Sequence, residues 1–343
     1  MLSAPMSVVF SITSKCNLAC KHCLASDGSK DDLNLKEIKK AIEEIATLKI
    51  FSLAVFGGEP FASKDIFEIL HEISKYPIGI TINTNGTLID ERVAEKLRGY
   101  DIRGYTVSLD GSNPEIAKKM RGKGVFEKTI RGIKALLKYN NNVLISATVT
   151  KMNCTDLQNI AKLGKELNVN GVRFNNVFYI NNAECFLDDL IISKKDFAEN
   201  CKDIDEMKQK YGNFISGSCV QIFEFTDKIK KGEDKRIFQK CDNIEVAPCG
   251  AGTSKCAIKP NGDVVPCEIL WNTVAGNIRE KSLGEIWRSS KVMNDFRKPF
   301  TLTENEIGDC ISCEFRYICY TGHRCNPYYY PGGLKNKKLF CIK

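Results

Sequence analysis

Three cysteines near the N-terminus have the spacing of metal ligands. Cys16, Cys20 and Cys23 follow one another as C-x3-C-x2-C, directly after a short apolar run. Three thiolates on one tight loop can ligate three irons of a [4Fe–4S] cubane and leave the fourth iron open. Because an open coordination position lets a metal bind a reactant, the motif predicts a reactive cluster. The alternative is that three free structural cysteines share this loop by chance.

A second group of cysteines lies near the C-terminus. Of the 16 cysteines, eight lie between residues 249 and 341: Cys249, Cys256, Cys267, Cys310, Cys313, Cys319, Cys325 and Cys341. Clustering of this kind indicates metal ligation rather than a disulfide framework. The eight thiolates are enough for two iron–sulfur clusters or, since C-x2-C pairs are also common zinc ligands, for two zinc ions. Buried structural roles fit the scattered cysteines better: Cys154, Cys185, Cys201, Cys219 and Cys241.

The overall composition argues against nucleic acid and membrane partners. The formal charge of the 343-residue chain is +8, but three clusters held by eleven cysteines would add about 5 negative charges and leave about +3. Basic residues are also interleaved with acidic ones, as in Asp227–Arg236, which is typical of a solvated face. The N-terminus has no signal-peptide pattern, and no stretch approaches the ~20 apolar residues that span a bilayer. We therefore expect a cytoplasmic protein.

The first half of the chain alternates strand-like and helix-like segments. Apolar, β-branched runs occur at Val8–Ile12, Leu53–Phe56, Ile78–Ile82, Tyr105–Leu109, Val143–Val149 and Val172–Phe178. Segments with helical spacing of apolar residues lie between them, at 35–45, 66–73 and 130–137. Successive βα units imply a parallel sheet with right-handed crossovers. Six units, rather than eight, predict a partial barrel that is open along one side.

These patterns predict an α/β protein with three parts. Residues 1–185 would form the partial (β/α)6 TIM-like barrel, and residues 186–248 a bridging region with a polar helix around Ser193–Tyr211. Residues 249–343 are rich in Gly, Pro and Cys and poor in long periodic segments. A small domain with so little core needs staples, which metal clusters would supply.

The sequence resembles the radical SAM superfamily in several motifs besides the cysteines. Gly57-Gly58-Glu59-Pro60 follows the second predicted strand and is similar to the GGEP motif of that family, which binds the methionine amino group of S-adenosylmethionine (SAM). Its glycines let backbone approach the ligand closely, and Glu59 can accept a hydrogen bond from an ammonium group. For this motif alone, a plain turn is the alternative.

Other matching segments lie at the ends of later strands. Thr84-Asn85-Gly86 follows the third predicted strand, and Ser108-Leu109-Asp110-Gly111 follows the fourth. The resemblance implies that Ser108 contacts the ribose hydroxyls and that Arg121 clamps the SAM carboxylate; an ordinary solvated arginine is the alternative. His22 stands where many members have an aromatic residue whose backbone meets the adenine, so its side chain is expected to matter little. Placement at the C-terminal ends of strands is typical of barrel active sites.

The C-terminal cysteines resemble the SPASM domain of peptide-modifying radical SAM enzymes, which carries two auxiliary [4Fe–4S] clusters. By resemblance to the anaerobic sulfatase-maturating enzymes, one cluster would use Cys249, Cys256, Cys267 and Cys325. The other would use Cys310, Cys313, Cys319 and Cys341. One departure is the interval of five residues between Cys319 and Cys325, where three are usual.

The resemblance implies three [4Fe–4S] clusters and SAM as cofactors, with SAM cleaved to a 5′-deoxyadenosyl radical that abstracts hydrogen from a substrate. Two fully ligated auxiliary clusters have no vacant iron, so we expect them to carry electrons in an oxidation such as dehydrogenation or cross-link formation. The open barrel suits a peptide or protein substrate. Because few residues precede the first strand, we expect recognition through a short motif or through a separate leader-binding protein. A flavodoxin or ferredoxin would serve as external electron donor.

Two further residues bear on the type of reaction. Glu268 follows Cys267, and in sulfatase-maturating enzymes an aspartate at the corresponding place is assigned to deprotonate the substrate. Glu268 is therefore a candidate general base, with a surface carboxylate as the alternative. A radical epimerase would instead need a thiol as hydrogen donor, and Cys219 is the best-placed spare cysteine unless it is buried and inert. A non-catalytic iron–sulfur electron carrier is the third hypothesis, but such a carrier needs no amino-acid clamp.

Overall fold

The structure is a computed structural model that describes residues 2–25, 31–139, 142–178, 180–218 and 250–297. Several predicted functional residues lie outside these ranges: Cys219, Cys249, Cys310, Cys313, Cys319, Cys325 and Cys341. The predictions for them are not tested by the structure.

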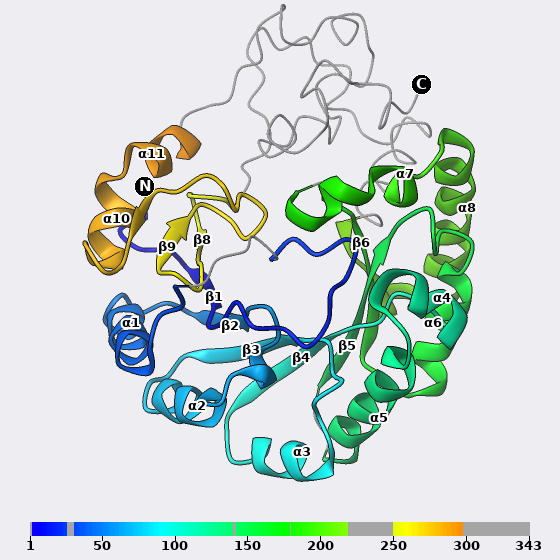
Figure 1. The fold of residues 1–343 in the computed structure, drawn as a ribbon, viewed down its shortest axis with the longest axis horizontal. Coiled ribbons are helices and arrows are strands. Elements are labelled where there is room, and N and C mark those ends of the chain that lie inside the picture. The colour runs from blue at the N-terminus through cyan, green and yellow to red at the C-terminus, as the bar shows by residue number, and fades with distance from the viewer. Residues whose placement is uncertain (1, 26–30, 140–141, 179, 219–249, 298–343) are drawn as a thin grey trace, which may run out of the picture.

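Six parallel strands form the centre of the fold, in sequence order. They are β1 (Ser7–Ser11), β2 (Ser52–Phe56), β3 (Gly79–Thr84), β4 (Ile102–Ser108), β5 (Val143–Val149) and β6 (Gly171–Asn176). Each overlaps a predicted strand. Figure 1 shows them along an arc with helices on its outer side. The predicted α/β class with a partial barrel is confirmed.

Six helices from the described part of the chain cover the outside of the sheet. They are α1 (Leu35–Thr47), α2 (Ile66–Ser74), α3 (Glu91–Leu97), α4 (Pro114–Arg121), α5 (Val125–Lys138) and α6 (Leu157–Glu166). Side-chain caps mark the start of α1, α3 and α4. In α1, Asn34 and Glu37 form a reciprocal capping box at the N-terminus. Ile38, Ile42 and Ile45 are buried on one face, because their spacing follows the helical repeat.

Strand alternation separates the apolar outer layer from a polar interior. Along β5, Val143, Ile145 and Ala147 are fully buried in the apolar core, while Ser146 and Thr148 on the other face line a cavity. Successive side chains of a strand point to opposite faces of the sheet. The inner face of the barrel is therefore free to carry polar groups without disturbing the core.

The segment after β6 continues the sheet at one edge. It contains the 3-10 helix Asn181–Phe186, α7 (Leu187–Leu190), α8 (Lys194–Tyr211), the 3-10 helix Gly212–Phe214 and β7 (Ile215–Ser216). α8 corresponds to the predicted polar helix, and its N-cap is Ser193, whose side chain accepts from Asp196 N. The short strand β7 pairs in parallel with β6.

The C-terminal described segment extends the other edge. β8 (Lys255–Ile258) pairs in parallel with β1, followed outward by β9 (Asp263–Val265) and β10 (Gly276–Asn277) in antiparallel pairing. α10 (Leu283–Ser289) and α11 (Lys291–Arg297) follow, and Trp287 Nε1 donates to the Leu2 carbonyl at 3.0 Å. The sequence patterns did not predict that this segment joins the barrel sheet.

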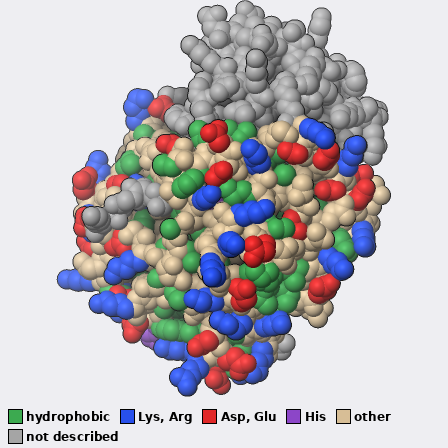
Figure 2. Space-filling view, turned by 45° about the vertical axis from the view of Figure 1, so that its right-hand side comes forward, with side chains coloured by type: hydrophobic (Ala, Val, Ile, Leu, Met, Phe, Trp, Pro, Cys, Tyr) green, Lys and Arg blue, Asp and Glu red, His purple; other side chains and the backbone are tan. Residues whose placement is uncertain are grey.

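Two general expectations can be compared with the surface. Basic and acidic side chains are interleaved over the described part of the face shown in Figure 2, whereas Asp227–Arg236, for which a solvated face was predicted, lies outside the described residues. Among the residues that the structure describes, no helix combines the length and apolar character needed to cross a membrane.

Candidate active site

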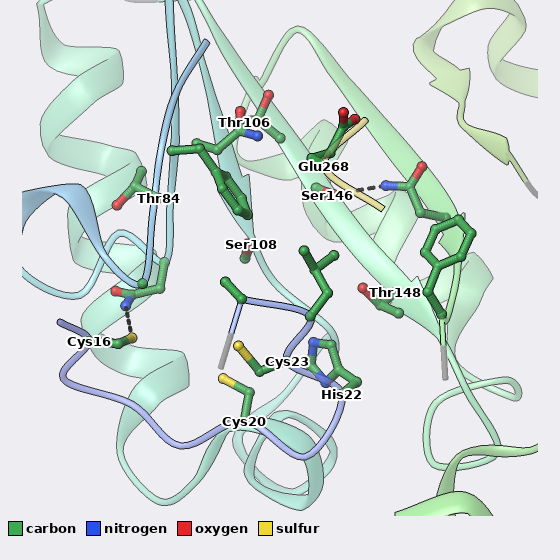
Figure 3. Close-up of a pocket in the computed structure, with 18 of the residues that line it drawn as sticks. Cys16, Cys20, His22, Cys23, Thr84, Thr106, Ser108, Ser146, Thr148 and Glu268 are labelled. Carbon is green, nitrogen blue, oxygen red and sulfur yellow. Dashed lines mark hydrogen bonds between the residues drawn. The ribbon is translucent and has the colours of Figure 1, made fainter. Parts of the chain in front are cut away.

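The three N-terminal cysteines lie on the loop after β1 and line one cavity of about 380 Å³, called the central cavity below (Figure 3). Cys16 is exposed, Cys20 is buried and Cys23 is half-buried, all as free thiols. Backbone contacts hold the loop, since Cys23 N donates to Cys20 O at 3.3 Å and Lys21 N donates to Met120 O at 3.1 Å. Burial raises the pKa of Cys20 to about 11, against the opposing effect of Arg121.

The two glycines of the GGEP segment pack against the loop that leads to Cys16. Gly58 N donates to the Thr13 carbonyl at 2.8 Å, and Glu59 N donates to the Lys15 carbonyl at 2.8 Å. A Cβ atom on Gly57 would lie 2.6 Å from the Thr13 carbonyl oxygen, and one on Gly58 would lie 2.5 Å from that of Lys15. Both glycines also line the central cavity. Only glycine allows this backbone approach.

The carboxylate of Glu59 is buried and accepts hydrogen bonds from neighbouring residues of the protein. Its carboxylate accepts from Thr84 Oγ1 at 2.7 Å, from Asn85 N at 2.7 Å and from Phe61 N at 3.2 Å. Burial raises its pKa, although these three donors favour the carboxylate form. The carboxylate thus accepts from three donors within the protein, and its contact with a ligand ammonium stays a prediction. Glu59 joins GGEP to the end of β3, while Pro60 begins a short 3-10 helix.

Thr84, Asn85 and Ser108 line the central cavity, as their positions at strand ends predicted. Asn85 Nδ2 donates to Asn17 Oδ1 at 3.0 Å and lies 4.0 Å from Cys16 Sγ (Figure 3). Through these contacts the end of β3 holds the cysteine loop.

Arg121 at the end of α4 is buried beside the cysteines rather than solvated, with 10% of its side chain exposed. Its Nε donates to Asp110 Oδ2, its Nη1 lies 3.7 Å from Cys20 Sγ, and its Nη2 lies 3.2 Å from His22 Nε2. Burial opposes the charge, but Asp110 and Cys20 raise the pKa of Arg121 above its ordinary value. The guanidinium therefore stays charged, and the solvated alternative is wrong.

His22 belongs to the same group, since its ring contacts Arg121 and Asp110, and the expectation that its side chain matters little for cofactor binding stays a prediction. Burial lowers the pKa of His22 to about 4, which makes the ring neutral at neutral pH. His22 Nε2 lies 3.2 Å from Arg121 Nη2 and 3.3 Å from Asp110 Oδ2, so the ring tautomer decides whether it accepts from Arg121 or donates to Asp110. Within the described residues, His22 Nδ1 has no hydrogen-bond partner. The ring also lines the central cavity.

Glu268 reaches the central cavity from the C-terminal segment, so it is not a plain surface carboxylate. Lys255 Nζ donates to its two oxygens, and the Cys267 thiol donates to Oε2 at 3.1 Å. Burial disfavours the charged form, but Lys255 and Cys267 together outweigh burial and lower the pKa of Glu268. Glu268 is therefore a carboxylate at neutral pH.

The remaining described cysteines differ in environment. Cys256 and Cys267, both predicted cluster ligands, are buried, and burial raises the pKa of Cys256 to about 12. Cys256 shares the outer face of the sheet with Val8, its register partner. Cys154 is buried, as its structural interpretation requires, whereas Cys185 is exposed, so that interpretation is wrong for Cys185.

Comparison with known proteins agrees with this geometry. Residues 10–164 match the family model of the radical SAM superfamily, and residues 249–314 match that of SPASM, an iron–sulfur cluster-binding domain. An AdoMet-dependent heme synthase from Methanosarcina barkeri is 31% identical over 349 residues, which cover 100% of this chain and 97% of that protein. The chain belongs to the radical SAM superfamily, in its SPASM-domain branch.

Relatives of this radical SAM protein also include a maturase. The mycofactocin maturase of Mycolicibacterium smegmatis is 29% identical over 328 residues, covering 94% of this chain and 78% of that protein. Among solved structures, SuiB of Streptococcus suis bound to the precursor peptide SuiA has a TM-score of 0.73 at 20% identity. The match covers 95% of this chain and 73% of SuiB, and at this identity it supports the fold alone.

Membership of the family implies iron–sulfur clusters and SAM, and the residues around the radical SAM cysteines fit such a cluster. Among the described residues, no three His, Cys, Asp or Glu side chains converge as ligands of a single ion would. A cubane binds each cysteine to a different iron and needs no such convergence. Three free thiols on the wall of one cavity therefore fit a cluster better than a zinc ion.

Sequence reasoning missed the polar inner wall of this radical SAM barrel. Thr106, Ser146, Thr148, Arg173 and Asn175 line the central cavity from β4, β5 and β6. The signal was present in the sequence, because each polar residue alternates with a buried apolar one inside a predicted strand.

Proposed function

We propose that this protein cleaves SAM and oxidatively modifies a peptide or protein substrate, by dehydrogenation or cross-link formation. The observation that carries the proposal is that Glu268, from the SPASM segment, lines the same cavity as Cys16, Cys20 and Cys23. A potential base and the predicted cluster ligands thus face one space. The mycofactocin maturase relative favours a peptide substrate.

Residues of the central cavity would hold the cluster and bind SAM. Cys16, Cys20 and Cys23 would hold the cluster, and a bound, reduced [4Fe–4S] cluster supplies the electron that splits SAM. Arg121, held by Asp110, would bind the SAM carboxylate.

Glu268 would take the substrate proton. Lys255 donates to both of its oxygens and so favours the ionised form that a proton acceptor requires. Once hydrogen abstraction and proton loss have occurred, the substrate is strongly reducing and can give up an electron. The predicted cluster ligand Cys267 directly precedes Glu268, and both side chains lie near Lys255. An auxiliary cluster there would receive that electron, and a flavodoxin or ferredoxin would serve as external donor.

A second candidate substrate is a tetrapyrrole. The heme synthase relative favours it, because the match covers 97% of that protein. The match with the mycofactocin maturase covers only 78% of the maturase. The epimerase alternative also stays open, because Ser218, the residue before Cys219, lines the central cavity.

The first experiment separates an enzyme from an electron carrier. Anaerobically reconstituted protein is mixed with SAM and dithionite, and 5′-deoxyadenosine is measured by chromatography. We expect 5′-deoxyadenosine even without substrate. Its complete absence would contradict a radical enzyme. Peptides encoded beside the gene, and porphyrins, are then tested as substrates by mass spectrometry. A loss of two mass units per dehydrogenation or cross-link supports oxidation. An unchanged mass with solvent deuterium at an α-carbon supports epimerisation.

A further inference from the structure

Arg173 on β6 is a charged side chain of the central cavity that has no partner in the described structure. Three described side chains of the cavity wall are formally charged at neutral pH: Arg121, Arg173 and Glu268. Arg121 is paired with Asp110, and Glu268 with Lys255. In the described structure, no hydrogen bond or ion pair involves the side chain of Arg173, whose backbone pairs with Ser146 on β5 and Ser216 on β7. The wall therefore has one positive charge that is not balanced locally.

Arg173 lies away from the cysteine loop. It is the third residue of β6, and its register partner on β5 is Ser146. In Figure 3, Ser146 and Thr106 lie at the opposite end of the view from Cys20 and Cys23. Arg121, in contrast, is in contact with Cys20. The cysteine end thus has its own guanidinium, and Arg173 belongs to the other end of the cavity.

The neighbours of Arg173 complete a set of hydrogen-bond donors. Asn175, the next inward residue on β6, donates from Nδ2 to Ser146 Oγ at 3.0 Å. Because Ser146 Oγ accepts this bond, its own hydroxyl hydrogen is available, and no described residue accepts it. A guanidinium fork beside a free hydroxyl donor is suited to a planar anion with two oxygens.

We propose that Arg173 binds a carboxylate of the substrate, with Ser146 as a second donor, at the end of the cavity away from the cysteines. The inference rests on the proposed function and specifies its substrate class as carboxylate-bearing. A half-buried guanidinium without an anion is unfavourable, so the substrate would supply the missing charge. One guanidinium matches the single charge of a carboxylate better than a phosphate dianion. Both candidate substrates offer this group, as an acidic side chain or C-terminus of a peptide or as a propionate of a tetrapyrrole.

The test uses chemical protection of arginine in the anaerobically reconstituted protein loaded with SAM. Phenylglyoxal modifies accessible, unpaired arginines, and peptide mass spectrometry gives the modification rate at Arg173. Two matched probe pairs distinguish the sources of carboxylate: a glutamate-rich peptide amide against its glutamine counterpart, and coproporphyrin III against its tetramethyl ester. We expect a carboxylate probe to slow modification of Arg173 about tenfold and its neutral counterpart to leave the rate unchanged. The pair that protects identifies the source. Protection by neither carboxylate, or equal protection by a neutral counterpart, would overturn the proposal.

Direct measurements of probe affinity in variants provide a second test of the proposal. Arg173→Gln should weaken binding of the protecting probe about tenfold, and Ser146→Ala should weaken it less. Arg103→Gln, which removes an exposed arginine of β4, is the matched control and should bind the probe normally. SAM affinity of Arg173→Gln should stay within about twofold of the wild type. If SAM binding is lost instead, Arg173 serves the SAM carboxylate and the proposal is wrong. Failure of the proposed function is a separate result, since it would appear as wild-type protein that forms no 5′-deoxyadenosine.

Discussion

Lys255 Nζ donates to both carboxylate oxygens of Glu268, at 3.0 and 3.2 Å. The two side chains are 29% and 27% exposed, so the pair is partly shielded from water. Lys255 precedes Cys256 on β8, and Glu268 follows Cys267. The ion pair therefore links the two chain segments that carry these predicted cluster ligands, and it holds an ionised carboxylate at the wall of the central cavity.

Glu268→Gln should stop product formation while SAM cleavage persists. Glutamine keeps the shape of the side chain but cannot accept the substrate proton. Product is measured by mass spectrometry and 5′-deoxyadenosine by chromatography in the same samples. Glu280→Gln, at an exposed glutamate, is the matched control. Cys219→Ala should remain active. An active Glu268→Gln together with an inactive Cys219→Ala would favour the epimerase.

Arg121→Ala should weaken SAM binding about tenfold or more, because a charge-assisted contact to the SAM carboxylate is worth roughly 1.5–3 kcal/mol. Asp110→Asn should act in the same direction, since Asp110 orients the guanidinium. Equilibrium dialysis with labelled SAM measures the affinity, and iron analysis checks that the clusters remain. Arg131→Ala, at an exposed position on α5, should change neither. Unchanged SAM affinity in Arg121→Ala would remove Arg121 from the SAM site.

Gly58→Ala should disturb the N-terminal cluster without affecting the C-terminal segment. The added Cβ would lie 2.5 Å from the Lys15 carbonyl oxygen, so the loop that carries Cys16 must move. We expect loss of about 4 irons per chain and of SAM cleavage. Gly99→Ala is the control, because its Cβ would meet nothing closer than 3.5 Å. Full iron content and activity in Gly58→Ala would contradict this prediction, because the loop would then accommodate the added Cβ without losing the cluster.

Reconstituted protein should contain about 12 irons and equal labile sulfide, as three cubanes require. Replacing Cys16, Cys20 and Cys23 together by alanine should leave about 8 irons and abolish SAM cleavage. Iron and sulfide assays, with electron paramagnetic resonance of the reduced protein, measure this. Purified protein with zinc and no labile sulfide would contradict the cluster assignments.

Elements whose signals are local could be predicted from the sequence. β5 has the predicted bounds, Val143–Val149, because alternation of apolar residues marks a strand wherever it lies. The apolar face of α1 was predicted for the same reason, from the helical spacing of Ile38, Ile42 and Ile45. The C-x3-C-x2-C motif and GGEP were recognisable because their chemistry depends on neighbours within a few residues. The parallel βα order then places both at one end of the barrel.

The tertiary structure decided which distant groups share a site. β8 pairs with β1 although most of the chain separates them, and this pairing brings Glu268 to the cavity of the N-terminal cysteines. Edge pairing depends on backbone hydrogen bonds that any residues can form, so it leaves no local pattern. The contacts of His22 with Arg121 and Asp110 likewise join a loop, a helix end and a strand end. Sequence alone determined the cofactor chemistry and the order of the barrel elements. Burial and long-range packing decided that Arg121 is paired with Asp110. They also decided that the side chain of Arg173 is left without a partner among the described residues.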